Sequence, residues 1–275
     1  MSSTFLERWP RPSVMGIVNV TPDSFSDGGA LRSPVEAAEA AQAMLDAGAA
    51  LVDVGGESTR PRADPVSLDE ELRRVLPVLE ALPGRPLSVD TSRAEVARRA
   101  LALGAVMVND VSALRREPEL AEVVAGAGID VCLMHMRGTP NTMQDDPRYE
   151  DVVSDVASFL EERIAFAVDS GIAEDRICVD PGIGFGKTPD HNLELLRRLD
   201  RIVSLGRPVL VGASRKSTLA RVLGEPGAVG SDAASVGAAV AAFDRGAALF
   251  RVHEVRPHVE ALAAAAAVER GSVVT

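Results

Sequence analysis

Short apolar runs alternate with longer amphipathic segments along the whole chain, and no polar linker interrupts the alternation. The runs are rich in Val, Ile and Leu, which is typical of parallel strands buried on both faces. We therefore predict eight strands, at residues 14–20, 50–54, 87–90, 105–109, 129–134, 177–180, 209–213 and 248–252.

The segments between the runs show helix periodicity and recognisable helix ends. Residues 33–47 begin with Ser33, place Pro34 at the first helical position and stop at Gly48, which are the usual start and stop signals. Ser67 precedes Glu70 by three residues, and this spacing predicts a capping box. The other predicted helices span residues 67–82, 92–103, 117–127, 149–170, 189–205, 232–245 and 255–269.

Eight strand–helix alternations predict an α/β fold, a (β/α)8 TIM barrel in a single domain. The alternative is an open doubly wound sheet, which usually has fewer strands and a glycine-rich turn after the first one. Here the first strand runs into Asn19-Val20-Thr21-Pro22, which lacks that turn. We expect a short N-terminal segment at residues 1–12 and the barrel domain over residues 13–275.

Composition narrows the classes of function. The chain has 275 residues and a net charge of −11, which argues against nucleic-acid binding. No apolar run reaches the roughly 18 residues of a membrane span, and residues 1–12 lack an apolar signal core. A cytoplasmic protein without a membrane partner is expected. Cys132 and Cys178 each lie within an apolar run, and we interpret them as reduced core residues.

Polar side chains follow every predicted strand, at the end of the barrel where TIM barrels hold their active sites. The opposite strand ends carry mostly Gly and Pro turns. The first polar residues after the eight runs are Asn19; Asp53, Glu57, Thr59 and Arg60; Asp90; Asn109 and Asp110; His135; Asp180; Ser214, Arg215 and Lys216; and Arg251 and His253.

This ring of polar residues divides into two chemical types. Asp90, Asn109 and Asp180 can hydrogen-bond the N–H-rich edge of a planar heterocycle. The second type consists of donors after the seventh, eighth and first strands, where barrels often hold phosphate; these are Lys216, Arg251, His253 and Asn19. The ring therefore predicts a ligand with a planar polar head and an anionic tail.

Two polar segments rich in Gly or Pro, residues 21–31 and 57–66, follow the first two strands and are predicted to act as lids. Residues 180–187 look like a phosphate-binding P-loop, but Pro181 stands where its first glycine is required. The glycines of this segment would instead let the backbone approach a flat ligand, with Phe185 as an aromatic wall.

The remaining histidines suggest no metal site. His135 lies at a strand end without partners at metal-ligand spacing, so we interpret it as structural. His191 and His258 lie near predicted helix starts and are expected at the surface. The chain contains only two lysines, Lys187 and Lys216.

The strand-end segments resemble the signature motifs of the dihydropteroate synthases. The segments NVTPDSFSDGG at 19–29 and GGESTRP at 55–61 are similar to the first and second signatures. The resemblance spans nearly the whole chain, in family order, through SVDT at 88–91, ND at 109–110, LMHM at 133–136, DPGIGFGK at 180–187, SRKS at 214–217 and RVH at 251–253.

This resemblance implies a defined reaction. Members of the family condense 6-hydroxymethyl-7,8-dihydropterin diphosphate with p-aminobenzoate, which releases diphosphate and forms 7,8-dihydropteroate, a folate precursor. The resemblance also implies Mg²⁺ as cofactor, a homodimer, and sensitivity of the p-aminobenzoate pocket to sulfonamide drugs. Because the arylamine is neutral at pH 7, we expect no catalytic triad and no covalent intermediate, and rate enhancement by positioning and electrostatics.

Matching positions imply three groups of site residues. The pterin would be held by Asp90, Asn109, Met134, Asp180 and Lys216. The diphosphate would be held by Asn19, Arg251 and His253, with Asn19 also the metal ligand. The p-aminobenzoate site would be bordered by Thr59, Arg60, Phe185, Lys216 and Ser217. The residues expected to act in catalysis are Lys216, Asp180, Arg251 and His253.

The departures from the family pattern are few. Ile183 stands where many members have Phe, and we expect it beside the pocket rather than in it. Glu254 replaces an Asp that often follows His253. The stretch before Ser13 is short, which suggests a reduced hairpin at the bottom of the barrel.

Three alternatives remain open. A pterin-dependent methyltransferase would share the barrel and the acidic pterin site, but would not need the SRKS and RVH motifs. A Schiff-base aldolase could use Lys216, although Arg215 and Ser217 beside it suit anion binding better. A binding-only paralogue would hold the pterin without turnover.

Overall fold

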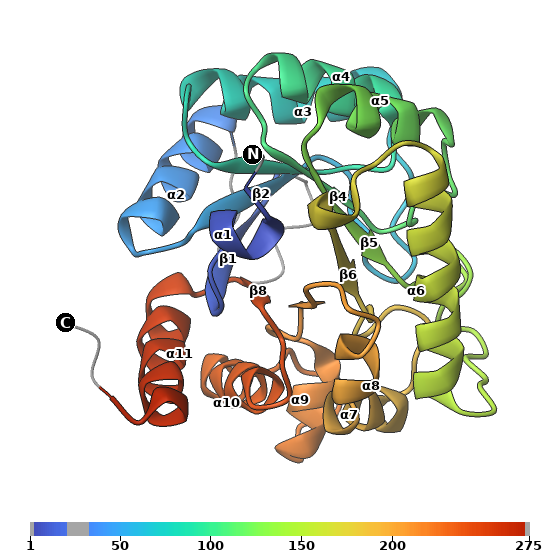
Figure 1. The fold of residues 1–275 in the computed structure, drawn as a ribbon, viewed down its shortest axis with the longest axis vertical. Helices are drawn as coiled ribbons and strands as arrows, with labels where there is room; N and C mark the ends of the chain where they lie inside the picture. Colours follow the sequence, from blue (N-terminus) through green and yellow to red (C-terminus); the bar gives the residue numbers. More distant parts are fainter. Residues whose placement is uncertain (1–2, 21–32, 273–275) are drawn as a thin grey trace.

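Eight parallel strands stand side by side within residues 3–20 and 33–272, the parts of the chain that the computed structural model describes. Their order is β6-β5-β4-β3-β2-β1-β8-β7, and a bridge between Val179 and Val209 brings the two outer strands together. The predicted (β/α)8 barrel is thereby confirmed (Figure 1). The strands are β1 Ser13–Asn19, β2 Leu51–Gly55, β3 Leu87–Asp90, β4 Met107–Asp110, β5 Asp130–Met134, β6 Ile177–Asp180, β7 Leu210–Val211 and β8 Leu249–Val252.

Helices surround the strands as an outer layer (Figure 1). All eight predicted helical segments are helical. The helices are α1 Phe5–Arg8, α2 Pro34–Asp46, α3 Leu68–Ala81, α4 Ala94–Ala102, α5 Glu119–Ala127, α6 Val152–Asp169, α7 Pro189–Arg197, α8 Asp200–Val203, α9 Ser217–Val222, α10 Asp232–Phe243 and α11 Val255–Arg270, with a 3-10 turn η2 at Glu174–Arg176.

Two local expectations differ from the structure. The Ser67 hydroxyl accepts a hydrogen bond from the Glu70 amide at 3.2 Å, but the Glu70 carboxylate turns to Arg73 and Arg74 instead of the Ser67 amide. Only half of the expected capping box forms, because two guanidinium partners lie within one helical turn. The helix expected at 189–205 is divided into α7 and α8, and Leu199 between them is fully buried.

The N-terminal segment closes the bottom of the barrel. Phe5 of helix α1 and Trp9, the residue after this helix, are buried against apolar residues near the amino-terminal ends of the strands. The side chains of Arg8 and Trp9 both donate to Asp130 at the start of β5, with 2.9 Å from Arg8 Nε and 2.7 Å from Trp9 Nε1. The bottom of this barrel therefore has a short helix where a reduced hairpin was expected.

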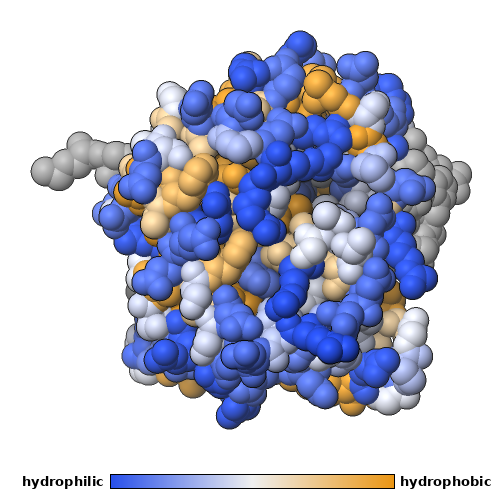
Figure 2. Space-filling model, turned by 90° about the vertical axis from the view of Figure 1, so that its right-hand side faces the viewer, coloured by the Kyte–Doolittle hydropathy of each residue, from blue (hydrophilic) through white to orange (hydrophobic). Residues whose placement is uncertain are grey.

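The two cysteines lie in the interior, as expected from their positions within apolar runs. Cys132 and Cys178 are buried free thiols, and they lie opposite each other in the register of β5 and β6. The side of the barrel drawn in Figure 2 is mainly hydrophilic, with apolar residues in scattered spots. Within the described ranges, none of the helices combines the length and apolar character that crossing a membrane requires.

Candidate active site

A cavity of about 1020 Å³ opens at the carboxyl ends of the strands. Every binding or catalytic residue expected from the sequence lines it. These residues are Asn19, Thr59, Arg60, Asp90, Asn109, Met134, Asp180, Phe185, Lys216, Ser217, Arg251 and His253. Because β1 to β8 supply them in turn, the parallel register of the barrel alone brings together residues more than 200 positions apart.

A charged network forms the floor of this cavity. Asp53, on β2, is fully buried beneath it and accepts hydrogen bonds from Asn109 Nδ2 at 2.8 Å and from Arg251 Nε at 2.7 Å. Arg251 also donates to Asp90 at 2.8 Å. The residues expected to hold the heterocycle and those expected to hold the anion are therefore directly joined, through Arg251. Asp53 was visible among the strand-end residues, but no role was predicted for it.

Burial raises the pKa values of the two carboxyl groups in the cavity. The pKa of Asp90 rises to about 7, although the positive charge of Arg251 opposes the shift. The pKa of Asp180 rises to about 6, and the amide of Gly182, which donates to its carboxylate at 2.6 Å, opposes the shift. Both groups can therefore change protonation near neutral pH, where carboxyl groups in water are fully ionised.

Lys216 and Phe185 face each other across one side of the cavity. The Lys216 ammonium lies 4.3 Å from the centre of the Phe185 ring, a cation–π contact. Burial lowers the pKa of Lys216 to about 8, and Arg251 adds to the effect. Phe185 also packs on a small cluster of buried methionines that includes Met134. This side combines one cation with flat apolar surface, which suits an aromatic ligand.

His253 lies at the end of β8 and contacts Ser214 at the end of β7, with 3.0 Å between Nδ1 and the hydroxyl oxygen. Burial, aided by the charges of Arg215 and Arg251, lowers the pKa of His253 to about 3. A neutral imidazole offers a hydrogen bond but no charge to an anion. Arg215 itself binds Asp232 and Glu254, each at 2.8 Å, so its guanidinium has a structural role.

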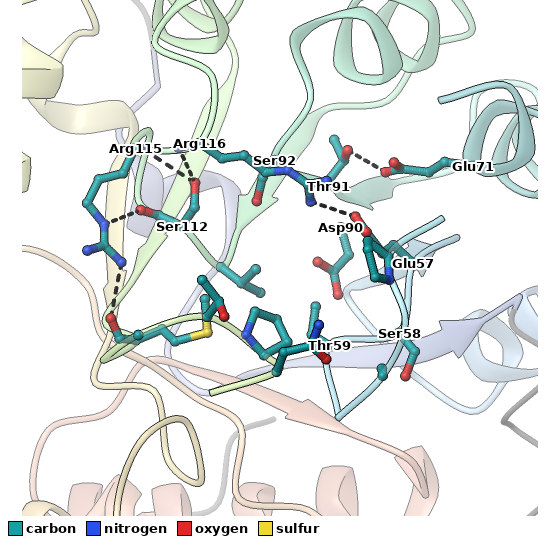
Figure 3. A pocket seen from close by; sticks show the side chains of 18 residues that line it. Glu57, Ser58, Thr59, Glu71, Asp90, Thr91, Ser92, Ser112, Arg115 and Arg116 are labelled. Atoms are coloured by element: carbon teal, nitrogen blue, oxygen red, sulfur yellow. Dashed lines mark hydrogen bonds and ion pairs between the residues drawn. The ribbon is translucent and has the colours of Figure 1, made fainter. Parts of the chain in front are cut away.

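The expected lid at residues 57–66 is held by ion pairs in this structure. Arg116 binds Glu57 at 2.7 Å, and Arg93 lies 3.8 Å from the same carboxylate. The Val66 amide also donates to Glu57 at 3.3 Å. Behind the lid is a second cavity of about 510 Å³, which shares Asp90, Thr59 and two other residues with the main one (Figure 3). The other expected lid, at residues 21–31, lies outside the described residues.

Three further expectations can be compared with the structure. His135, interpreted as structural, is buried, and its Nδ1 lies 2.8 Å from Lys187 Nζ. His258 was wrongly expected at the surface, because α11 turns it inward and its Nδ1 lies 2.6 Å from the Glu254 carbonyl oxygen. Ile183 was expected beside the pocket, yet it lines the cavity.

The described residues offer no preformed metal cage, since they contain no group of three or more His, Cys, Asp or Glu side chains placed to hold an ion. Asn19, the expected metal ligand, ends β1 and lines the cavity. This donor set fits an ion such as Mg²⁺, which takes one or two protein oxygens and completes its shell with phosphate oxygens and water.

Comparison with known proteins identifies the family. The model of the pterin binding enzymes matches residues 15–253. The dihydropteroate synthase of Escherichia coli K12 is 48% identical over 254 residues, which cover 91% of this chain and 89% of the relative. The chain belongs to the dihydropteroate synthase family.

Solved structures of dihydropteroate synthases share the fold closely. The enzyme from Yersinia pestis, in complex with a sulfonamide drug, superposes with a TM-score of 0.88 at 46% identity and covers 94% of this chain and 95% of its own. The enzyme from Xanthomonas albilineans with 4-aminobenzoic acid gives 0.85 at 47% identity, with 94% of each chain covered.

Proposed function

We propose that this chain joins 6-hydroxymethyl-7,8-dihydropterin diphosphate to p-aminobenzoate, releasing diphosphate and forming 7,8-dihydropteroate for folate biosynthesis. The chain is a transferase of the dihydropteroate synthase type. The observation that carries the proposal is that all twelve motif residues line one cavity at the carboxyl ends of the strands. Family membership and the ligands of its relatives support the identity of the substrates.

The pterin ring lies between Asp90, Asn109 and Asp180 in this proposal, with Met134 against its face. Ionised carboxylates accept hydrogen bonds from the ring N–H groups. One N–H of the Asn109 amide already donates to Asp53, and its oxygen and second N–H can accept from and donate to the ligand. Lys216 donates to the acceptor edge of the ring, and its cationic nitrogen borders the arylamine as well.

The diphosphate is placed between Asn19, Arg251 and His253. Arg251 supplies charge and a fork of donors, while the neutral His253 supplies a single donor. Mg²⁺, held by Asn19 and the diphosphate oxygens, would neutralise charge on the leaving group. Arg251 must share its donors between the diphosphate and Asp53 or Asp90, so substrate binding is expected to rearrange this ion pair.

The arylamine is placed between Thr59, Arg60, Phe185, Lys216 and Ser217. Its neutral nitrogen attacks the pterin methylene carbon, the bond from that carbon to the diphosphate oxygen breaks, and the amine nitrogen then loses a proton. No side chain needs to form a covalent bond. The contribution of Lys216, Asp180, Arg251 and His253 is to hold both reactants in line and to stabilise the departing charge.

Diphosphate release with and without p-aminobenzoate tests this function. We expect rapid release from the pterin diphosphate only when the arylamine is present. Diphosphate release at the same rate with and without the arylamine would contradict a transferase. Tight pterin binding without release would favour the binding-only paralogue, and methyl transfer from a methylated pterin would favour the methyltransferase. Reduction by borohydride with a carbonyl substrate, if it trapped Lys216, would favour the aldolase.

The same proposal includes a cytoplasmic homodimer. Four of the exposed large apolar residues lie on α7, on α9 and in the loop that follows α9; these are Leu193, Val222, Leu223 and Val229. Helices α7 and α9 contact each other, and exposed apolar residues on neighbouring elements are candidates for a protein interface. Sedimentation velocity should therefore show a dimer that Val222→Asp weakens, whereas a wild-type monomer at micromolar concentration would contradict it.

A further inference from the structure

Lys187 is one of only two lysines in the chain, and the proposed reaction does not use it. It lies at the edge of the cavity and is almost completely buried, with 2% of its surface exposed. It ends the glycine-rich segment that follows β6 and directly precedes the N-cap of α7. A buried ammonium is unfavourable unless its donors are satisfied. The question is therefore what this lysine holds.

The Lys187 ammonium is surrounded by acceptors. Its Nζ lies 2.9 Å from the Gly182 carbonyl oxygen, 3.0 Å from that of Phe185 and 2.8 Å from His135 Nδ1. An ammonium has three donors, which match these three acceptors, and a fourth, the His135 carbonyl oxygen, lies farther away at 3.4 Å. Burial lowers the pKa of His135 to about 2, so this ring is neutral and its Nδ1 can accept. Burial lowers the pKa of Lys187 to about 7, although the nearby charge of Asp180 opposes this shift.

This arrangement is the reverse of a P-loop. In a P-loop, backbone amides and a lysine converge on a phosphate anion. Here the carbonyl oxygens of the segment converge on its own lysine. The backbone permits this because Gly182 has φ +68 and Gly186 has φ +67. A Cβ atom on Gly182 would also collide with the His135 carbonyl oxygen, so glycine is required there.

The two carbonyls that Lys187 holds bracket the turn that presents Phe185. The Phe185 amide donates to the Gly182 carbonyl oxygen at 3.1 Å, across the same turn. The Gly182 amide in turn donates to the Asp180 carboxylate. The position of the Phe185 ring beside Lys216 and the direction of the Asp180 carboxylate therefore both depend on the path of this turn.

The geometry points to Lys187 as a positioning residue, which fixes the Gly182–Phe185 turn so that Phe185 meets the arylamine and Asp180 meets the pterin. The inference rests on the proposed function, because that function supplies the two ligands. Lys187 acts through the backbone, since its side chain is almost fully covered.

Lys187→Met tests the inference, because it keeps an unbranched side chain and removes all three donors. We expect KM for p-aminobenzoate to rise about tenfold or more, and the dissociation constant of the pterin to rise as well, with kcat changed by less than about threefold. Lys187→Arg, which keeps charge and donors, should recover part of the loss. A folded Lys187→Met enzyme with KM within about twofold of wild type would overturn the inference.

Tyr149→Phe is the matched control, because the Tyr149 hydroxyl donates to the Gly186 carbonyl oxygen at 2.7 Å but touches neither bracketing carbonyl. It should change KM by less than about twofold. Equal effects of Tyr149→Phe and Lys187→Met would assign Lys187 a general anchoring role instead and overturn the inference.

The wild-type enzyme provides a measurement that needs no folded variant at position 187. Protein with ¹³C-labelled lysine should give two Cε signals, and Lys216→Arg identifies the one from Lys187. Saturating p-aminobenzoate should shift the Lys187 signal, although the ligand does not touch this residue. An unshifted Lys187 signal in protein that demonstrably binds the ligand would overturn the inference. Failure of the ligand to bind at all would contradict the proposed function instead.

Discussion

Asp180 ends β6 and is only 6% exposed. Its place at a strand end was evident from the sequence. Its raised pKa was not, because the shift depends on burial depth and on the Gly182 amide that opposes it. The same holds for Asp53, whose bonds to Asn109 and Arg251 connect residues 56 and 198 positions away. Residue identity predicts which groups can act, whereas only the structure shows how their charges are balanced.

Asp180→Asn should separate binding from stability. Folding raises the pKa of this carboxyl from 3.8 to about 6, so the folded state holds the proton more tightly than the unfolded state. Asp180 therefore lowers stability as pH rises through this window, by at most about 3 kcal/mol for two pKa units. At pH 7 the unliganded variant should be more stable than wild type, yet bind the pterin about 100-fold or more weakly.

Thermal unfolding between pH 4 and 8 and calorimetric titration at pH 7 would measure both effects. The gain in stability should vanish near pH 4, where the wild-type carboxyl is protonated. Asp145→Asn, at an exposed loop position, is the control and should change neither quantity. Unaltered pterin affinity in Asp180→Asn would refute the placement of the pterin.

At the scale of elements, the long periodic segments were predicted well and the short ones were not. Helix α1 has only four residues, and the polar sequence around it gave no helix signal. Its stability comes from tertiary contacts, which sequence periodicity does not register. Helix α9 was missed for the same reason, since six residues are too few to show a period. The split of residues 189–205 into α7 and α8 also depends on packing, because the sequence there has no helix breaker.

The contact between α1 and β5 should be important for stability and not for catalysis. Asp130 is 1% exposed and binds the side chains of Arg8, Trp9 and Arg176. Asp130→Ala would leave the indole N–H and a partly buried guanidinium without their acceptor, at a cost of about 3–5 kcal/mol. Because the active site lies at the opposite end of the barrel, kcat/KM of the folded variant at 25 °C should stay within about twofold of wild type.

Urea unfolding and steady-state kinetics on the same preparations would measure this pair of effects. Glu95→Ala is a suitable control, since Glu95 pairs with Arg98 and Arg99 on the surface of α4, where such pairs contribute less than about 1 kcal/mol. A comparable loss of stability in both variants would contradict the expected large contribution of the contact with α1 to the free energy of unfolding.

At the scale of the whole molecule, the barrel was predictable because a repeated strand–helix pattern leaves few alternatives. Once the barrel is accepted, the strand ends must meet, so the polar strand-end residues that line the cavity follow from the sequence. The second cavity behind residues 57–66 does not follow, because it depends on the ion pairs of Glu57 and Glu71 with arginines from other elements. Long-range pairs between loops have no local signature in the sequence.

Net charge and local charge oppose each other in this protein, and the local charge should decide how p-aminobenzoate enters. The molecule carries a net charge of −11, which repels anions. The cavity, however, is lined by two carboxylates and six basic side chains, which are Arg60, Lys187, Arg215, Lys216, Arg221 and Arg251. Arg215 is balanced by Asp232 and Glu254 and Arg251 by Asp53, so the excess of positive charge is smaller than this count, and Lys216 and Arg221 contribute to it. At physiological ionic strength the Debye length is about 8 Å, so a ligand at the mouth of the cavity senses mainly these nearby cations.

Raising NaCl from about 20 to 500 mM should therefore raise KM for p-aminobenzoate by about three- to tenfold, because salt screens the attraction. The neutral analogue p-aminobenzamide has the same ring and amine, so its KM should stay nearly constant and thereby control for general effects of salt on the enzyme. If the net charge of the whole molecule dominated instead, KM for p-aminobenzoate would fall with salt. The direction in which KM for p-aminobenzoate changes with salt decides between control by the net charge and control by the charge at the cavity, because the two predict opposite directions.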